Sequence, residues 1–439
     1  MSTNTSQKAK NIRGVIRYLQ KFKNAVVVIY LDDKTIESPL YSSHIRDIAL
    51  LHQAGLKVVI IPGARQRIDQ VLTVAGIKWS YFNNTRITDT DAMPLIKMAA
   101  FDVSNTIMTS LAANNITAVI GNWVRARKKG IFGGLDFGTA GEIDKLQTEA
   151  IITELNEGFI PIFPCIGWNS VGHPYNISST SLAQQIAIAL KADKLFFVTD
   201  NGSINSEKFN IPEGFPLSDT GEVPAMDLEQ VDAFLTSNKE AKNPVISIIE
   251  NAKEACSNGV TRVHLVDGNM DGVLPCEIFS DLGSGTMIYT SNYGRIRPMQ
   301  QTDIPAVLGV INPFVQSGKL LPRTEQQIAE NLFDYVVYEV DGGIHACAAL
   351  HKYDDCQGEI AAVAVEEAFN NMGIGPNLIN YLTEKAKEEG LKSIFIMTTQ
   401  ASDWFEKLGF TADVIDSLPA ERKSKWTPER NSKPYRKDL

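Results

Sequence analysis

The sequence predicts an α/β protein with two domains: an open parallel sheet with helices on both faces, followed by a smaller α+β domain. The chain has 439 residues, more than the roughly 250–300 that one hydrophobic core usually supports. Up to residue 290, short β-branched and aliphatic runs alternate with amphipathic stretches, which is the pattern of a parallel sheet. Beyond residue 290 the order of elements changes. We therefore expect domains over residues 25–290 and 291–439.

Composition excludes several classes of protein. With 44% hydrophobic and 21% charged residues the chain is typical of globular proteins. A net charge of -9 argues against nucleic acid as a partner, because binding phosphates needs surplus Lys and Arg. The longest aliphatic runs, 26–31 and 58–61, are too short to span a membrane. Five cysteines without CxxC spacing favour free thiols in a reducing compartment, so we expect a cytoplasmic enzyme, without a metal.

Residues 1–24 predict a basic amphipathic helix. This stretch carries six Lys or Arg and no acid, with apolar residues at helical spacing. Three interpretations compete: a membrane-surface or transit helix, a solvated face, or a helix that docks on another subunit. We favour docking, because the first strand follows at residue 25 with no spacer for cleavage.

The elements of the first domain follow in order. A buried strand is expected at 25–31, then a helix that Ser42 or Ser43 caps and Gly55 ends. A second strand at 56–61 leads into the segment 62–65. The alternation then continues with strands at 117–120, 159–163, 194–199 and 260–266, a helix at 182–191 and a loop at 201–226.

The second domain begins with a predicted β-hairpin. Its strands cover 335–340 and 344–350, and the Asp-Gly-Gly turn between them tolerates positive φ. The elements that follow are a strand at 359–365, a loop at 370–375, a helix at 376–389, a strand at 393–397 and a helix at 402–408.

The loop at 370–375 is the most informative motif. Gly373 and Gly375 allow close approach of a ligand, and Pro376 suits the first turn of a helix. Free amides at the start of that helix would bind a pyrophosphate. Taken alone, the same pattern also fits a plain tight turn.

Two side chains on the neighbouring strands suit acyl transfer to an amine. Glu359, which alternation places on the same face as Val363 and Val365, could take a proton from an ammonium group. Thr398, at the end of the next strand, could protonate a leaving thiolate. The alternatives are a solvated carboxylate and a structural hydroxyl, and direct transfer needs neither Cys347 nor Cys356.

The acceptor is suggested by basic residues. Arg323 precedes an amphipathic helix, and residues 421–439 carry seven Lys or Arg against three acids. Guanidinium groups pair bidentately with carboxylates, so a dicarboxylate or amino-acid substrate fits. A solvated basic tail is the alternative.

Residues 295–439 resemble the GNAT acetyltransferase family. The family loop Q/R-x-x-G-x-G/A matches at both glycines but has Asn370 in its first position. The resemblance implies that backbone groups of the preceding strand and of the loop bind coenzyme A. The residues implied are Val363, Ala364, Val365, Asn371, Met372, Gly373, Ile374 and Gly375.

The first domain resembles the amino-acid kinase fold, specifically acetylglutamate kinases, through segments 86–89, 175–177, 194–200 and 283–288. A kinase-like unit followed by an acetyltransferase resembles the bacterial-type N-acetylglutamate synthases. That family uses acetyl-CoA and L-glutamate in the first step of arginine biosynthesis. The resemblance implies Glu359 as general base, and Arg323, Arg430 and Ser432 as glutamate-binding residues. It also implies that the N-terminal helix interlocks a homo-oligomer, a hexamer.

The kinase machinery is missing. Tyr30, Asp32 and Asp33 stand where active kinases place a lysine and glycines, and Thr180 replaces a metal-organising Asp. Carboxylates would repel a triphosphate, so we expect no phosphoryl transfer. Three alternatives remain: a bifunctional synthase and kinase, an acetyltransferase for another amino acid with the first domain as a ligand sensor, and a non-catalytic amino-acid-binding regulator.

Feedback inhibition by L-arginine is the last expectation. In arginine-sensitive relatives the effector site lies near the end of the kinase-like domain, and the matching residues here are His264, Glu277 and Gly283, together with Tyr18 of the N-terminal helix. A carboxylate suits a guanidinium ligand. An ordinary structural role for His264 and Glu277 is the alternative.

Overall fold

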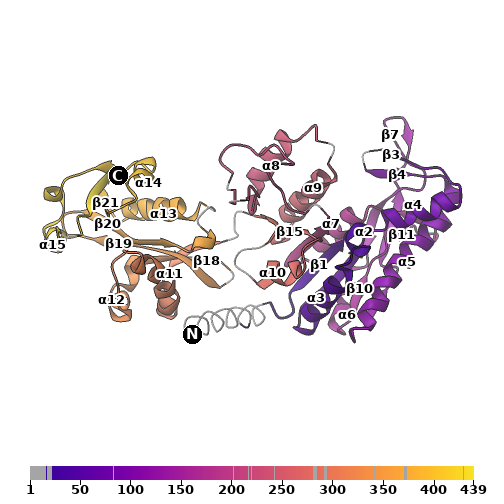
Figure 1. Cartoon of the computed structure of the whole chain (residues 1–439), viewed down its shortest axis with the longest axis horizontal. Coiled ribbons are helices and arrows are strands. Elements are labelled where there is room, and N and C mark those ends of the chain that lie inside the picture. The colour runs from indigo at the N-terminus through magenta and orange to yellow at the C-terminus, as the bar shows by residue number, and fades with distance from the viewer. Residues whose placement is uncertain are drawn as a thin grey trace. The chain divides into compact units, whose positions relative to one another are not determined.

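The computed structural model divides the chain into two compact units, Met1–Ser291 and Asn292–Leu439 (Figure 1). The residues it describes are 16 and 22–439, apart from 83, 201, 216, 219, 242, 280–283, 291–293, 341, 370–372 and 429. The helix expected over residues 1–24 therefore lies almost wholly outside the described residues. No helix within the described ranges is long and apolar enough to cross a bilayer.

The N-terminal unit is built on an eight-stranded sheet in the order β14-β16-β15-β13-β1-β2-β10-β5. All neighbouring strands pair in parallel except β15 and β16. This confirms the predicted mostly parallel sheet. The strands are β1 (Val26–Leu31), β2 (Lys57–Pro62), β5 (Ala118–Ile120), β10 (Ile160–Ile162), β13 (Lys194–Thr199), β14 (Ala225–Asp227), β15 (Arg262–Asp267) and β16 (Thr286–Tyr289).

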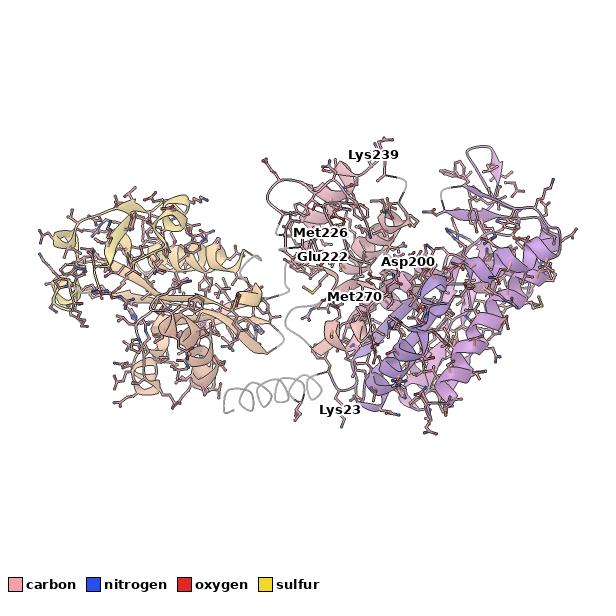
Figure 2. All side chains as sticks on the ribbon, viewed as in Figure 1. Lys23, Asp200, Glu222, Met226, Lys239 and Met270 are labelled. Carbon is pink, nitrogen blue, oxygen red and sulfur yellow. The ribbon has the colours of Figure 1, made fainter. Side chains whose placement is uncertain are left out.

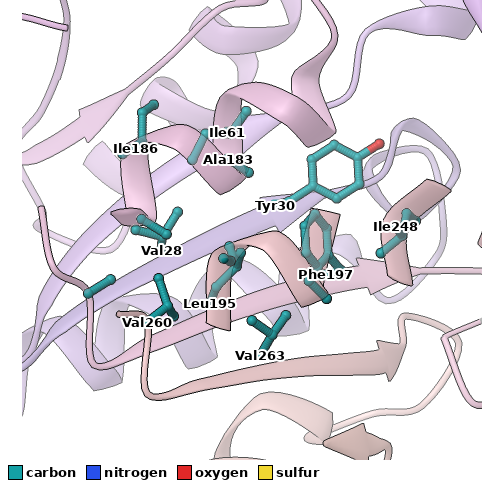
Figure 3. Packing of buried hydrophobic residues seen from close by; sticks show 14 of the residues in the cluster. Val28, Tyr30, Ile61, Ala183, Ile186, Leu195, Phe197, Ile248, Val260 and Val263 are labelled. Atoms are coloured by element: carbon teal, nitrogen blue, oxygen red, sulfur yellow. The ribbon is translucent and has the colours of Figure 1, made fainter. Parts of the chain in front are cut away.

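Helices cover both faces of this sheet because its strands are apolar on both sides. On β1, Val28 and Tyr30 pack against one helical layer, and Val27 and Ile29 pack against the other (Figure 3). The first layer contains α7 (Ser179–Ala189), α8 (Leu228–Ser237), α9 (Pro244–Ser257) and α6 (Thr148–Asn156); the second contains α3 (Tyr41–Gln53), α5 (Met93–Ala112) and α10 (Val273–Phe279). Ser42 and Ser43 do not cap α3, because its N-cap is Leu40.

A second, smaller sheet and two hairpins were not expected from the sequence. The sheet has the order β12-β11-β6-β9 and consists of β6 (Val124–Lys128), β9 (Gly141–Leu146), β11 (Ile166–Trp168) and β12 (Pro174–Asn176). The hairpins are β3 (Ser80–Phe82) with β4 (Thr85–Ile87), and β7 (Ile131–Phe132) with β8 (Leu135–Asp136). The remaining helices of the unit are α2 (Asp33–Ile36) and α4 (Arg65–Val74).

The C-terminal unit has a seven-stranded sheet in the order β17-β18-β19-β20-β21-β23-β22, in which only β20 and β21 pair in parallel. The strands are β17 (Arg295–Pro298), β18 (Tyr335–Val340), β19 (Gly343–Lys352), β20 (Gln357–Val365), β21 (Ser393–Thr398), β22 (Thr411–Ala412) and β23 (Lys433–Asp438). Helix α13 (Ile374–Glu388) covers one face, and α11 (Ile304–Gln316) with α12 (Glu325–Glu330) covers the other (Figure 1). Two short helices complete it, α14 (Ser402–Lys407) and α15 (Ala420–Ser424).

One alternative and one expectation about this unit were wrong. The last residues are not a solvated tail: β23 lies inside the sheet, where it pairs with β21 along its whole length. The faces of β20 do not alternate regularly either. Ala362 has φ +54° beside a register shift, so Val363 and Val365 pack on the α13 side with Ile360. Glu359 precedes Ile360 and therefore faces the α11 side, away from both valines.

Candidate active site

The candidate active site lies where β20 and β21 separate. The two strands pair at only three positions, the last of which joins Glu359 to Phe395. Beyond it β20 continues with β19 and β21 continues with β23. Residues 360–365 thus present one backbone edge with no strand partner in the described sheet. Unpaired amides at such an edge are donors for a carbonyl or amide ligand, and Val363, Ala364 and Val365 lie along it.

The glycine loop leads into the N-terminus of α13. Gly373 is the N-cap residue and has φ +68°, a conformation that glycine adopts without strain. A Cβ on Gly375 would lie 3.0 Å from the Trp404 ring, so the helix start packs closely against α14. Ile374 points into the core, and only its backbone can reach a ligand. Asn371 and Met372 lie outside the described residues.

Glu359 is buried and holds two hydrogen bonds on one oxygen. Its Oε2 accepts from the Tyr353 hydroxyl at 3.0 Å and from Arg422 Nε at 2.7 Å. Burial, together with the charge of Glu359, raises the pKa of Tyr353 well above its usual value, which keeps the phenol a donor. Sequence reasoning missed both partners; the basic composition of 421–439 was the only signal for Arg422.

Three guanidinium groups lie within electrostatic range of one another near this site. The pKa of Arg430 is lowered by burial and then by the positive charges of Arg323 and Arg422. Arg430 Nη2 donates to the Lys319 carbonyl at 3.2 Å, and Arg323 Nη1 donates to the Leu321 carbonyl at the same distance. Gathering like charges is unfavourable without anions to compensate. Glu359 supplies one negative charge, and a dicarboxylate ligand would supply two more.

The other expected residues play less direct parts. Ser432 is buried, and its carbonyl accepts a hydrogen bond from Trp426 Nε1 at 3.1 Å. The Thr398 hydroxyl accepts from the amides of Gln400 and Ala401 at 3.3 and 3.0 Å, which fixes the turn after β21 and leaves its proton available. Burial raises the pKa of Cys347 to about 12, so this thiol is a poor nucleophile.

In the kinase-like unit, two carboxylates lie at the end of β1, beside the N-terminus of α4. Asp32 Oδ1 accepts from the Tyr30 hydroxyl at 3.2 Å and from the Asp33 amide at 3.0 Å. Asp33 Oδ2 accepts from the Gln66 amide, in the first turn of α4, at 2.7 Å. Burial and then the charge of Asp33 raise the pKa of Asp32 to about 7. Asp33 therefore occupies one of the donors at this helix start, where a phosphate would bind.

The remaining kinase positions also lack the parts for phosphoryl transfer. Lys34 pairs with Asp200, which follows β13 (Figure 2), at 2.5 Å. Thr180, in place of a metal-organising Asp, bonds to the Ser178 hydroxyl at 3.0 Å in the first turn of α7. Among the described residues, no group of three or more His, Cys, Asp or Glu side chains is placed to hold a metal.

The expected effector residues form a buried pair. His264 on β15 contacts Glu277 on α10, with Nδ1 and Oε1 2.7 Å apart, and its ring stacks on Phe196. The other oxygen of Glu277 accepts from the amides of Ser284 and Gly285 at 2.6 and 3.1 Å. Burial lowers the pKa of His264 to about 4, so the imidazole is neutral. Gly283 and Tyr18 lie outside the described residues.

Comparison with known proteins agrees with both units. Residues 27–267 match the Amino acid kinase family, and residues 311–410 match the Acetyltransferase (GNAT) family. An amino-acid acetyltransferase of Vibrio vulnificus is 32% identical over 99% of both chains. Another, from Yersinia pestis, is 31% identical over the full length of both.

Two solved structures cover 98% of this chain and 99% of their own. Both are N-acetylglutamate synthase from Neisseria gonorrhoeae. The structure with coenzyme A and L-arginine has a TM-score of 0.76 at 26% identity. The structure with coenzyme A and N-acetyl-glutamate has a TM-score of 0.62 at 27% identity.

Proposed function

Because the chain belongs to the amino-acid acetyltransferase family, we propose that it transfers the acetyl group of acetyl-CoA to the amine of L-glutamate, giving N-acetylglutamate and coenzyme A. One observation carries the choice of substrate. Arg422 pairs with the buried carboxylate of Glu359 at the point where β20 and β21 separate, and Arg323 and Arg422 are close enough to Arg430 for their charges to lower its pKa. After Glu359 neutralises one of these charges, two remain for the two carboxylates of the acceptor.

The reaction follows from this placement. Glu359 first takes a proton from the ammonium group, directly or through water, and the neutral amine nitrogen then attacks the thioester carbonyl carbon. The carbonyl oxygen becomes an oxyanion, which those amides of residues 363–365 that point to the unpaired edge of β20 stabilise. The C–S bond then breaks, the sulfur takes the proton of the Thr398 hydroxyl, and the Thr398 oxygen recovers a proton from the nitrogen that becomes the amide. Bound coenzyme A would place its pyrophosphate at the start of α13, near Gly373 and Gly375.

The kinase-like unit has a regulatory role in this proposal. It binds L-arginine through Glu277 and His264, and the bound and free states differ in acetyl-transfer activity. Such coupling requires arginine to bind one state more tightly than the other. Support comes from the Neisseria structure with L-arginine, which resembles this chain over nearly its whole length. The assembly is a homo-oligomer, a hexamer by family resemblance, and the activity is cytoplasmic.

The alternatives have weaker support. A bifunctional kinase would need to bind a triphosphate where Asp32 and Asp33 place two carboxylates, one of which already occupies the Gln66 amide. A regulator without catalysis would not need a buried carboxylate beside an unpaired strand edge. Acetylation of another amino acid is less well supported, since a dicarboxylate matches two guanidinium groups that bond to backbone carbonyls rather than to a protein carboxylate.

A panel of amino acids tests the proposal. Purified protein is incubated with acetyl-CoA and each of L-glutamate, L-aspartate, L-glutamine and L-lysine, and thiol release is measured with product mass. L-glutamate should support the highest kcat/KM, and the product should be N-acetylglutamate. Equal or better turnover of a neutral or basic amino acid would contradict the assignment.

A further inference from the structure

The ion pair between Glu359 and Arg422 has no part in the reaction as described above. We propose that Arg422 is a positioning residue: with Tyr353, it holds Glu359 by Oε2 so that Oε1 faces the acceptor amine, and it makes no contact with the substrate. This proposal rests on the proposed acetyl transfer and adds to it.

The geometry separates the two carboxylate oxygens. Arg422 Nε lies 2.7 Å from Oε2, and the Tyr353 hydroxyl lies 3.0 Å from the same atom. The side chains of the ion pair are only 13% and 8% exposed. Two donors on one oxygen fix the carboxyl plane, and the second oxygen is then the one that can receive a proton. A base whose orientation is already fixed loses less conformational entropy when the transition state forms.

The segment that carries Arg422 is itself anchored. It connects β22 to β23, and Arg436 of β23 ties down its start through Asp413 and the Ser417 carbonyl at 2.5 and 2.9 Å. Arg436 also bonds to Gln357, two residues before Glu359, at 2.8 Å. The segment that carries Arg422 is therefore hydrogen-bonded to β20, the strand that carries Glu359. This restricts how far Arg422 can move relative to Glu359, as a positioning contact requires.

Charge arithmetic favours this role over substrate binding. Of the three guanidinium groups, Arg422 is the one that pairs with Glu359, which leaves Arg323 and Arg430 for the two carboxylates of the acceptor. A buried carboxylate without its counter-charge is strongly destabilised. If Arg422 turned to the substrate, Glu359 would be left as such an unpaired buried charge. Arg323 and Arg430 bond to backbone carbonyls instead and are the two that can turn to a ligand.

A single substitution separates positioning from binding. Arg422→Gln should lower kcat by about 10- to 100-fold, as loss of a partner that orients a reacting group does, and change the KM for L-glutamate by less than about 3-fold. Arg422→Lys, which keeps the charge, should recover part of kcat. Lys423→Gln is the matched control, because it removes one positive charge from the same helix at a residue that pairs with Asp416; its kcat should equal that of the unmodified protein.

A double-mutant cycle tests whether Arg422 acts through Glu359. In a Glu359→Gln background, Arg422→Gln should cost less than about 2-fold in kcat, because no base is left to orient. Multiplicative losses, or a rise in KM with kcat retained in Arg422→Gln, would overturn the proposal. The double variant buries no unpaired charge, so it keeps the test usable if Arg422→Gln unfolds. If the unmodified protein does not acetylate L-glutamate, the proposed function fails instead, which is a distinct result.

Discussion

The edge of β20 beyond Glu359 and the edge of β1 and β2 at Asp32 and Asp33 are similar features with opposite outcomes. Each lies where buried strands end beside the N-terminus of a helix, α13 in one unit and α4 in the other. In the C-terminal unit the backbone donors of β20 beyond Glu359 have no strand partner on one edge within the described residues, and three guanidinium groups lie nearby. In the N-terminal unit two carboxylates stand at the helix start, and one of them accepts from the Gln66 amide. The comparison shows that the fold supplies a potential anion site, and that a few side chains decide whether it is open or closed.

The two regions also differ in how their charges are balanced. Arg323 and Arg430 lie near a third cation, which leaves a positive excess that a ligand can compensate. Asp32 and Asp33 lie side by side, and the resulting repulsion is met partly by holding a proton on Asp32. In the open site a bound ligand balances the excess positive charge. In the closed site a proton on Asp32 reduces the excess negative charge.

The largest expected effect comes from the base in the open site. Glu359→Gln keeps the shape and removes the proton acceptor, so kcat should fall by about 10²- to 10⁴-fold at neutral pH. The loss should shrink at high pH, where more of the glutamate amine is already neutral. Steady-state kinetics between pH 6 and 10 measure both effects. Glu388→Gln, on the exposed face of α13, is the control, and a near-normal rate for Glu359→Gln would place the base elsewhere.

The next effect concerns the cationic side of the same site. Arg430→Ala removes a charge-assisted contact to a substrate carboxylate, which is worth about 1.5–3 kcal/mol. The KM for L-glutamate should therefore rise by about 10- to 100-fold, while the KM for acetyl-CoA should change by less than about 3-fold. Lys433→Ala, an exposed residue of the same segment, is the control. A change confined to acetyl-CoA would reassign Arg430 to the coenzyme.

A smaller effect is expected at the pair His264 and Glu277, where a substitution should weaken inhibition by L-arginine. Glu277→Gln keeps an oxygen for the Ser284 and Gly285 amides but loses the charge that pairs with a guanidinium. The arginine concentration for half-maximal inhibition, measured against the variant's own uninhibited rate, should rise by at least about 10-fold. Glu250→Gln, exposed on α9, should respond as the unmodified protein does. Unchanged inhibition in Glu277→Gln would remove this residue from the effector site.

The closed site gives the smallest effect, which is one of stability. Asp32 has a folded pKa of about 7 against about 3.9 when unfolded, so the folded state binds more protons between these values. The free energy of unfolding should therefore fall as pH rises from 4 to 7. Asp32→Asn cannot lose that proton, and it should be more stable than the unmodified protein at pH 8 by about 1 kcal/mol.

Thermal unfolding of the two proteins at pH 5 and pH 8 measures this difference. Asp232→Asn, which removes an exposed carboxylate on α8, is the control. An identical pH dependence in Asp32→Asn and the unmodified protein would contradict the raised pKa of Asp32.

Much of the fold could be predicted from local pattern. The strands at 194–199 and 335–340 were predicted to the residue, because continuous β-branched and aromatic runs are bounded by turn residues. The small sheet of β6, β9, β11 and β12 was missed because β11 and β12 have three residues each, and because β6 and β9 are rich in charged residues. The face switch at Ala362 was missed because nothing in an alanine signals positive φ.

Only part of the site was accessible in the same way. Glu359 and the glycine loop stand on predictable elements. Arg422 lies 63 positions from Glu359, and its five-residue helix has no periodic signal. The carboxylate cap on α4 was equally hidden, since Asp33 and Gln66 meet only because β1 and β2 are neighbours in the sheet.

The contrast between an open acetyl-transfer site and a closed phosphate site is tested most directly by one reaction mixture. The protein is supplied with acetyl-CoA, L-glutamate and MgATP, and free thiol, ADP and acyl phosphate are followed together. We predict thiol release that depends on L-glutamate, with N-acetylglutamate as the product and no ADP or acyl phosphate above the level without enzyme. ADP formed in proportion to N-acetylglutamate, or no thiol release with L-glutamate present, would contradict this account.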